Sequence, residues 1–164
     1  MERPKIKLQL SPLDRKLNLI SNAILTLLWL LTVFSFFKLP DQIPTHFNSN
    51  GETDNYGDKD SIFTIPIVAT ILFIGLTVLN KFPEIFNYPE QITKTNAEHQ
   101  YSNATSTVRF LKLIITSIFT IITVLIIISS INRTKGLGLW FLPIILLLIF
   151  IPTIFYFIKI ATKK

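Results

Sequence analysis

The sequence predicts an all-α integral membrane protein with four transmembrane helices and an ordered extracellular loop between helices 1 and 2. Of its 164 residues, 49% are hydrophobic and only 16% are charged, which is too apolar for an ordinary water-soluble domain. Four windows contain no Asp, Glu, Lys, Arg or His, namely 18–37, 62–79, 113–131 and 139–158. A helix of about 17 to 25 such residues crosses the hydrocarbon core with every backbone amide satisfied internally.

The distribution of Lys and Arg predicts the orientation of these helices. If the four helices alternate in direction, twelve of the sixteen basic residues fall on one side: Arg3, Lys5, Lys7, Arg15, Lys16, Lys81, Lys94, Arg109, Lys112, Lys159, Lys163 and Lys164. The positive-inside rule makes this side cytoplasmic, so both termini and loop 80–112 are expected inside and loop 38–61 outside. The basic charges then meet anionic lipid headgroups, and nucleic acid is not an expected partner.

The first segment, 1–17, is expected to be a retained cytoplasmic arm. The apolar run after it is longer than the core of a cleaved signal peptide, which has about 7 to 15 residues. Helices 1 and 2 with their loop then form a unit over 18–79, and 113–164 forms a helical hairpin with a basic tail. The short turn 132–138 makes the last two helices antiparallel neighbours.

The outer loop, 38–61, is the candidate ligand-binding site, because it has the densest set of polar groups in the chain. Prolines fix two backbone torsions, and Asn50-Gly51 is a turn signal that folds the loop back on itself. Five acidic residues against two lysines favour a cationic extracellular peptide as ligand. The candidate residues are Pro40, Asp41, Pro44, His46, Asn48, Gly51, Asp54, Gly57, Asp58 and Lys59.

A metal site in the same loop is an alternative, because His46, Asp54 and Asp58 have suitable ligand chemistry. The competing interpretation is that His46 and Asn48 hydrogen-bond the backbone of the loop. No nucleophile elbow or zincin motif is present, so neither catalytic residues nor a cofactor are expected. The four windows also lack the ionisable residues that mark ion-coupled carriers.

The inner loop, 80–112, has interfacial composition followed by a helical pattern. The pattern Thr95-Asn-Ala-Glu98 predicts a capping box, and apolar residues every three or four positions from Tyr101 predict an amphipathic helix that continues into the third window. This helix either stiffens the connection or offers a surface to a cytoplasmic protein. The candidate partner residues are Phe86, Asn87, Tyr88, Pro89, Asn96, Gln100 and Tyr101.

The outer loop resembles the DUF1648 domain in the strings Leu39-Pro-Asp-Gln-Ile-Pro-Thr-His-Phe-Asn48, Gly51-Glu-Thr-Asp54 and Gly57-Asp-Lys59. Phe86-Asn-Tyr-Pro89 with the residues after it is similar to short four-helix members of that family. The domain also forms part of SdpI-type bacterial immunity and signalling proteins. The resemblance implies a bacterial cytoplasmic membrane protein that binds or senses an external ligand, plausibly for immunity to a membrane-active peptide. The alternatives are a metal-binding membrane enzyme or accessory and a structural subunit of a transporter.

Overall fold

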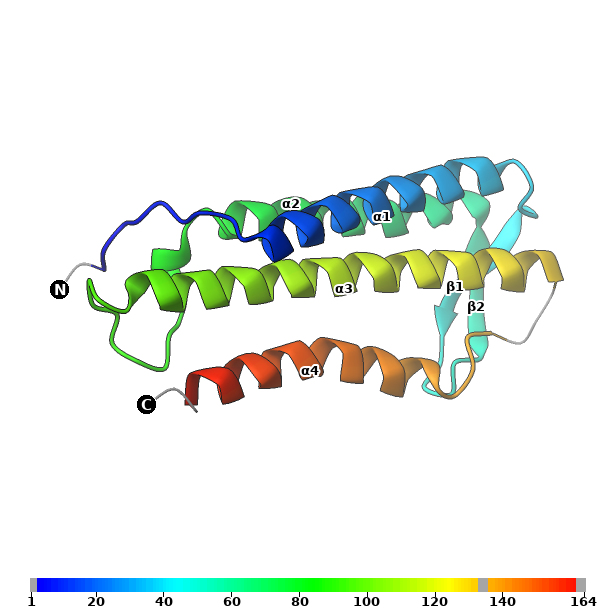
Figure 1. Cartoon of the computed structure of the whole chain (residues 1–164). Coiled ribbons are helices and arrows are strands. Elements are labelled where there is room, and N and C mark those ends of the chain that lie inside the picture. The colour runs from blue at the N-terminus through cyan, green and yellow to red at the C-terminus, as the bar shows by residue number, and fades with distance from the viewer. Residues whose placement is uncertain (1–2, 133–135, 162–164) are drawn as a thin grey trace.

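The computed structural model describes the backbone of residues 3–132 and 136–161. The elements in chain order are α1 (Pro12–Phe36), β1 (Gln42–Phe47), β2 (Thr53–Asp58), the 3-10 helix η1 (Lys59–Phe63), α2 (Thr64–Leu79), the 3-10 helix η2 (Pro83–Ile85), α3 (Ala97–Asn132) and α4 (Phe141–Ala161). The four α-helices run along one long axis, and the two strands lie across one end (Figure 1). We call this the hairpin end. The opposite end, formed by 3–17 and 80–112, is the basic end.

Each of the four apolar windows is helical over most of its length, and α1 and α3 begin well before their windows. α1 begins six residues before the charge-free run begins at Asn18, because Ser11 caps it: the Ser11 hydroxyl accepts from the Asp14 amide at 3.1 Å, and the Asp14 carboxylate accepts from the Ser11 amide at 3.1 Å. α3 has 36 residues without glycine or proline and is therefore about 54 Å long, well beyond the hydrocarbon thickness of about 30 Å. The predicted continuous helix through the inner loop is confirmed.

The start of α3 differs from the predicted capping box. The reciprocal pair forms between Thr93 and Asn96, where the Thr93 amide donates to Asn96 Oδ1 at 2.8 Å and the Asn96 amide donates to Thr93 Oγ1 at 3.3 Å. Thr95 and Glu98 are both exposed. The amide oxygen of asparagine satisfies the orphan amide as well as a carboxylate does, so the cap lies two residues earlier than expected.

The burial pattern is inverted relative to a water-soluble bundle. Small hydroxyl side chains fill the interior, and each donates to a carbonyl of its own helix: Ser21 to Leu17, Thr32 to Leu28, Thr116 to Lys112 and Thr123 to Phe119. Large apolar side chains point outward instead, such as Leu19, Phe34 and Ile71. Small interior residues let helices approach one another closely in lipid, where burial of apolar side chains does not drive helix association.

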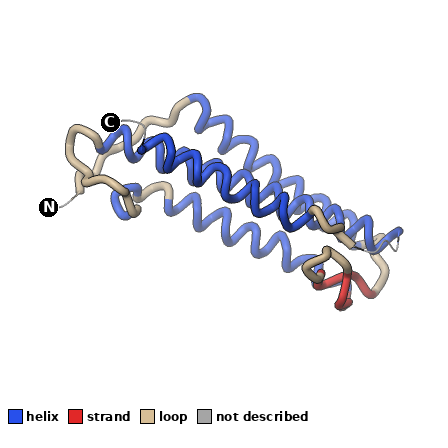
Figure 2. Tube along the Cα trace, turned by 90° about the horizontal axis from the view of Figure 1, so that it is seen from below, coloured by secondary structure: helices blue, strands red, loops and turns tan. Residues whose placement is uncertain are grey.

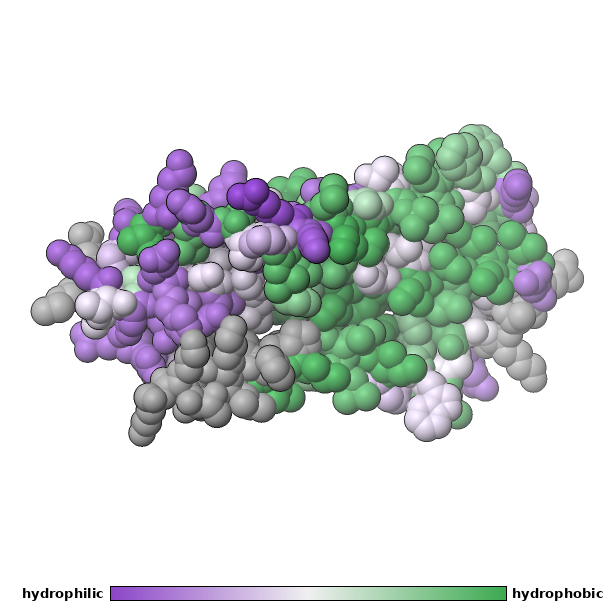
Figure 3. All heavy atoms as spheres, in the orientation of Figure 1, coloured by the Kyte–Doolittle hydropathy of each residue, from purple (hydrophilic) through white to green (hydrophobic). Residues whose placement is uncertain are grey.

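An apolar surface covers the middle of the bundle, whereas polar residues gather at the basic end (Figure 3). Three helical stretches are long and apolar enough to cross a membrane: α1, η1 with α2, and α3. Phe141–Ile151 forms a shorter apolar helix, and α4 packs against α3. Length, composition and inverted burial together define a membrane-type bundle.

The prediction of an all-α fold was wrong in one element, because the outer loop forms a two-stranded antiparallel sheet (Figure 2). β1 and β2 pair with Gln42 opposite Asp58 and Phe47 opposite Thr53, with irregular register between Pro44 and Phe47. The hairpin is anchored by an apolar cluster in which the buried residues are Leu39, Ile43, Ile62 and Ile126. Because Ile126 belongs to α3, the central helix holds the hairpin in place.

Candidate functional site

The turn of the hairpin is organised by the side chain of Asn48. Its Oδ1 atom accepts from the Asn50 amide at 2.9 Å and from the Glu52 amide at 3.0 Å. The Asn48 amide in turn donates to the Glu52 carbonyl at 2.9 Å. An asparagine that bonds to backbone amides two and four residues ahead fixes a tight reversal. The predicted order and reversal at Asn50-Gly51 are therefore confirmed, and Asn48 is one of the residues that hydrogen-bond the loop backbone.

Two side-chain pairs join the strands of the hairpin and its base. Nδ1 of His46 lies 2.6 Å from Oδ1 of Asp54, and Lys59 Nζ lies 3.0 Å from Oδ1 of Asp41. The Lys59 amide also donates to the Asp41 carbonyl at 2.9 Å, which closes the base of the hairpin. The side chain of Asp41 is 93% exposed and that of His46 is 67% exposed, so these pairs contribute little to stability and remain accessible to a ligand.

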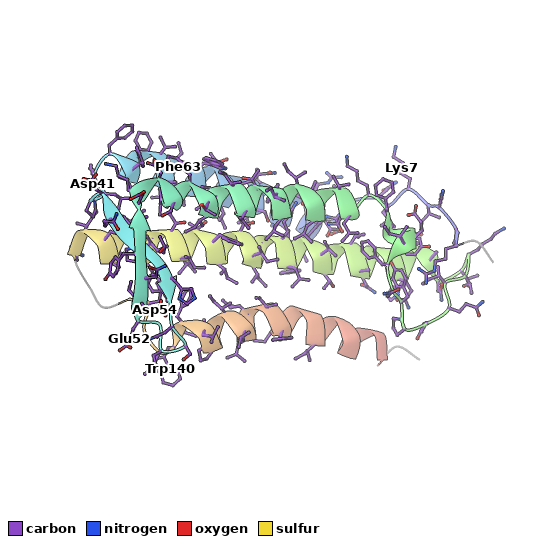
Figure 4. The ribbon with its side chains drawn as sticks, turned by 180° about the vertical axis from the view of Figure 1, so that it is seen from behind. Lys7, Asp41, Glu52, Asp54, Phe63 and Trp140 are labelled. Atoms are coloured by element: carbon purple, nitrogen blue, oxygen red, sulfur yellow. The ribbon has the colours of Figure 1, made fainter. Side chains whose placement is uncertain are left out.

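The carboxylates are spread along the whole hairpin rather than gathered at one point. Asp41 lies near the end of α1, whereas Glu52 and Asp54 lie near Trp140 at the start of α4 (Figure 4). Asp58 accepts a hydrogen bond from Gln42 Nε2 at 2.9 Å, at the base. The site is thus an extended acidic ribbon, made of Asp41, Glu52, Asp54, Asp58 and Asp60, and each of these residues is exposed.

The tip of the hairpin contacts the connection between α3 and α4. The Leu137 amide donates to the Gly51 carbonyl at 2.6 Å, and Glu52 forms an isolated antiparallel bridge with Gly136. Gly51 has φ +74°, which only glycine adopts easily, and a β-carbon there would collide with the backbone of Gly138. The ribbon is therefore held at both ends, at its base by the apolar cluster and at its tip by this contact.

An apolar pocket of about 280 Å³ lies at the base of the hairpin. Its lining residues come from β1, η1, α2 and α3: Ile43, Pro44, Thr45, Ser61, Ile62, Thr64, Ile65 and Ile126. Ser61 Oγ is buried and has no hydrogen-bond partner among the described residues. Gly57 keeps the pocket wall in place, because a β-carbon there would lie 2.9 Å from the Thr45 methyl group. The pocket offers an apolar cavity with hydroxyl groups at its edge.

Only part of the suggested metal set is brought together. His46 and Asp54 are in contact, but Asp58 lies at the base of the hairpin with Gln42. Within residues 3–132 and 136–161, no three His, Cys, Asp or Glu side chains form a group that would hold a metal ion. A metal ion held by His46 and Asp54 would need a third ligand from a group other than the described His, Cys, Asp and Glu side chains.

The candidate partner residues of the inner loop are used largely within the chain itself. Tyr101 is fully buried, and its ring centroid lies 5.5 Å from that of Tyr88 in a tilted arrangement; the Tyr88 hydroxyl donates to the Pro83 carbonyl. Gln100 is also buried and donates to Glu90, whereas Asn96 caps α3. Phe86 is half-buried and stacks on Tyr88. Asn87 and Pro89 are exposed, so they form the accessible part of this set.

The N-terminal arm closes over this loop. Arg3 donates to the backbone carbonyls of Glu84 and Phe86, and its guanidinium lies 5.5 Å from the ring centroid of Tyr88. This arginine fastens the arm to the inner loop, because a guanidinium both donates to carbonyls and stacks on aromatic rings.

Sequence reasoning missed a buried charged cluster at the basic end. Asp14 on α1 accepts from Ser106 at 2.6 Å and from Arg109 at 3.5 Å, both on α3. Lys112 Nζ donates to Asn18 and Thr77 and lies 4.4 Å from the Phe73 ring centroid. Arg109 and Lys112 are only 7% and 3% exposed. The sequence does contain a signal for this cluster. Asp14 completes the capping box of α1, and Arg109 and Lys112 lie one helical turn apart just before the third window.

The fold and this site define a mostly helical protein with membrane-length apolar helices and an exposed acidic hairpin. Residues 23–70, from within α1 to within α2, match the family model described as a domain of unknown function, DUF1648. The predicted DUF1648 resemblance is thereby confirmed for these residues, whereas the SdpI-like interpretation stays a prediction.

The chain is also similar to an archaeal protein. An uncharacterized protein of Archaeoglobus fulgidus is 37% identical over 82 residues, which cover 45% of this chain and 43% of the archaeal protein. The match therefore spans less than half the length of this curated relative. No solved structure matches the chain.

Proposed function

We propose that this chain is a multi-pass protein of the bacterial cytoplasmic membrane that binds an extracellular cationic, membrane-active peptide through its acidic hairpin. The proposed outcome is resistance to that peptide, by analogy with SdpI-like immunity proteins. Both termini and the inner loop are proposed to lie in the cytoplasm. The observation that supports this best is the ribbon of exposed carboxylates, held at both ends on an apolar bundle.

Electrostatics support a cationic ligand. The ribbon has five carboxylates, and within loop 38–61 two lysines, Lys38 and Lys59, oppose them. A surface of one sign raises the encounter rate with an oppositely charged ligand, and this effect falls as salt screens it over about 8 to 10 Å. We therefore expect binding to weaken steeply with ionic strength.

The apolar pocket supports an amphipathic ligand rather than a purely polar one. Ile65 and Thr64, at the start of α2, line it together with Ile126 of α3. The pocket thus lies where the apolar surface of the bundle meets the hairpin, which is the depth at which a peptide lying on the membrane presents its apolar side chains.

The test is a set of charge variants that keep the size of the side chain. Cells that express the chain are challenged with a synthetic amphipathic peptide of lysine and leucine, and the purified protein in nanodiscs is titrated with the same peptide. The combined Asp41→Asn, Asp54→Asn and Asp58→Asn variant should lose protection and bind at least several-fold more weakly. Glu98→Gln, an exposed change at the basic end, is the matched control and should behave like the parent chain. Equal survival of parent and triple variant at equal expression would refute the proposal.

Metal binding is the second candidate function, because His46 and Asp54 already form a pair with ligand chemistry. Analysis of bound metal in protein purified without chelators separates it from peptide binding. Stoichiometric zinc that disappears in His46→Ala, but not in the control His99→Ala, would favour the metal-binding function. Absence of bound metal from the parent protein would end that interpretation and leave peptide binding untouched.

A further inference from the structure

Arg109 is buried with most of its hydrogen-bonding capacity unused. Its side chain is 9% exposed, and its single hydrogen bond among the described residues runs from NH1 to Asp14 at 3.5 Å. A guanidinium has five N–H donors, and a buried charge is costly unless it is paired. Among the described residues, Arg109 has no polar side-chain atom that is both fully buried and without a partner. Its remaining N–H donors are therefore accessible from the surface.

The charges of this cluster do not balance. Arg109 and Lys112 bring two cations to α3, one turn apart, and Asp14 is the carboxylate that faces Arg109. The oxygens of Asp14 are already well occupied: Oδ1 accepts from Ser106 and Arg109, and Oδ2 accepts from the amide and hydroxyl of Ser11. The partners of Lys112 are neutral, namely Asn18, Thr77 and the ring of Phe73. One excess positive charge is left.

The depth of the cluster indicates what balances this charge. Arg109 lies four residues before the charge-free window that begins at Leu113, and Asp14 lies four residues before the window that begins at Asn18. If these windows mark the hydrocarbon core, both residues lie about 6 Å outside it, at 1.5 Å per residue. This is within the polar layer of about 5 to 8 Å on each side of the core, where lipid phosphates lie.

The neighbouring side chains are apolar and exposed. Leu13, next to Asp14, is 51% exposed, and Phe110, next to Arg109, is 37% exposed. A lipid molecule can therefore lie against the bundle directly beside the cluster. Because the oxygens of Asp14 are occupied and its side chain is only 3% exposed, the cluster has no free anion to hold a choline group.

We propose that Arg109, supported by Lys112, binds the phosphate group of an anionic lipid headgroup at the basic end of the bundle. The planar guanidinium matches a phosphate through two parallel hydrogen bonds, and the lipid supplies the missing negative charge. Asp14 is a positioning residue, because it orients the guanidinium from the opposite side. This proposal does not depend on what the hairpin binds.

The experiment measures lipid retention and stability. The protein is placed in nanodiscs of phosphatidylglycerol or of phosphatidylcholine, and lipid retained after extraction is counted by native mass spectrometry. Phosphatidylglycerol should be retained preferentially, and Arg109→Gln should lower that preference about tenfold. Arg15→Gln makes the same charge change at an exposed position of the same end and should leave it unchanged. An equal loss in both variants, or no loss in Arg109→Gln, would overturn the proposal.

Two further variants keep the test decisive if Arg109→Gln folds poorly. Arg109→Lys keeps the charge but lacks the planar fork, so it should retain phosphatidylglycerol less well than the parent. Asp14→Asn removes the carboxylate that positions Arg109 and should therefore lower the preference, whereas a purely structural cluster would lose stability without any change in lipid selectivity. In detergent, millimolar inorganic phosphate should stabilise the protein less than phosphatidylglycerol; equal stabilisation would mean a free-anion site and refute the lipid assignment.

Discussion

Gly51 at the hairpin tip lies so close to the backbone of Gly138, in the α3–α4 connection, that a β-carbon at position 51 would collide with the Gly138 carbonyl oxygen. Gly51→Ala should therefore destabilise the protein by about 1 to 3 kcal/mol, through the positive φ of +74° and through displacement of the Gly138 backbone. Thermal unfolding in detergent, followed by circular dichroism, measures the effect.

Gly75 provides the matched control for this prediction. It lies within α2, and a β-carbon there meets nothing within 4 Å. Gly75→Ala should be neutral or stabilising by up to about 1 kcal/mol, because alanine has the higher helix propensity. Similar melting temperatures for the two variants would contradict the proposed contact at the hairpin tip.

The orientation can be tested cleanly because the chain has no cysteine. Asn50→Cys at the hairpin tip and Lys94→Cys in the inner loop introduce single thiols at exposed positions. A membrane-impermeant maleimide should label the Asn50→Cys variant in intact cells and the Lys94→Cys variant only after permeabilisation. The reverse pattern would invert the topology and remove the extracellular ligand.

The inverted packing predicts an unusual response to added apolar volume. Thr32 is fully buried between helices, so Thr32→Leu should overpack the interior and cost about 1 to 3 kcal/mol. Val33→Leu, at a position 41% exposed on the outer surface, adds one methylene group and should be tolerated in lipid. Unfolding in mixed micelles compares the two; equal stability would mean that the interior is not closely packed.

The contact between Arg3 and the inner loop predicts a local effect. Arg3→Ala removes two hydrogen bonds and the stacking on Tyr88, so the arm should detach while the bundle stays folded. Trypsin should then cleave after Lys5 and Lys7 faster than in the parent, with little change in melting temperature. Lys94→Ala, a basic residue without such contacts, should leave cleavage at the arm unchanged, and an unaltered rate in Arg3→Ala would show that the contact does not hold the arm.

The sequence could predict the helices because their signal is local. A charge-free window of membrane length is readable without knowledge of its neighbours, and all four windows are helical. The turn at Asn50-Gly51 was equally readable. The strands beside it were not, because Thr53-Asp-Asn-Tyr-Gly-Asp58 has mostly poor strand formers. The two strands pair because Ile43 and Pro44 are buried at the base of the hairpin. This burial depends on tertiary contacts, which the local sequence does not show.

The buried cluster was beyond local reasoning for a related reason. Asp14 and Arg109 are separated by 95 positions and meet only because α1 packs against α3. Counted individually, each looked like an ordinary charge near a helix end. Their burial depends on helix rotation, which the periodicity of α3 leaves open, since its apolar residues occur on nearly every face.

The uninterrupted length of α3 has a mechanical consequence. Ile126 supports the hairpin and Tyr101 lies under the inner loop, 25 positions earlier on the same helix. At 1.5 Å per residue they are about 37 Å apart, and the rod between them has neither glycine nor proline to absorb a bend. If a molecule bound at the hairpin end displaces α3, the basic end of α3 should therefore move with it.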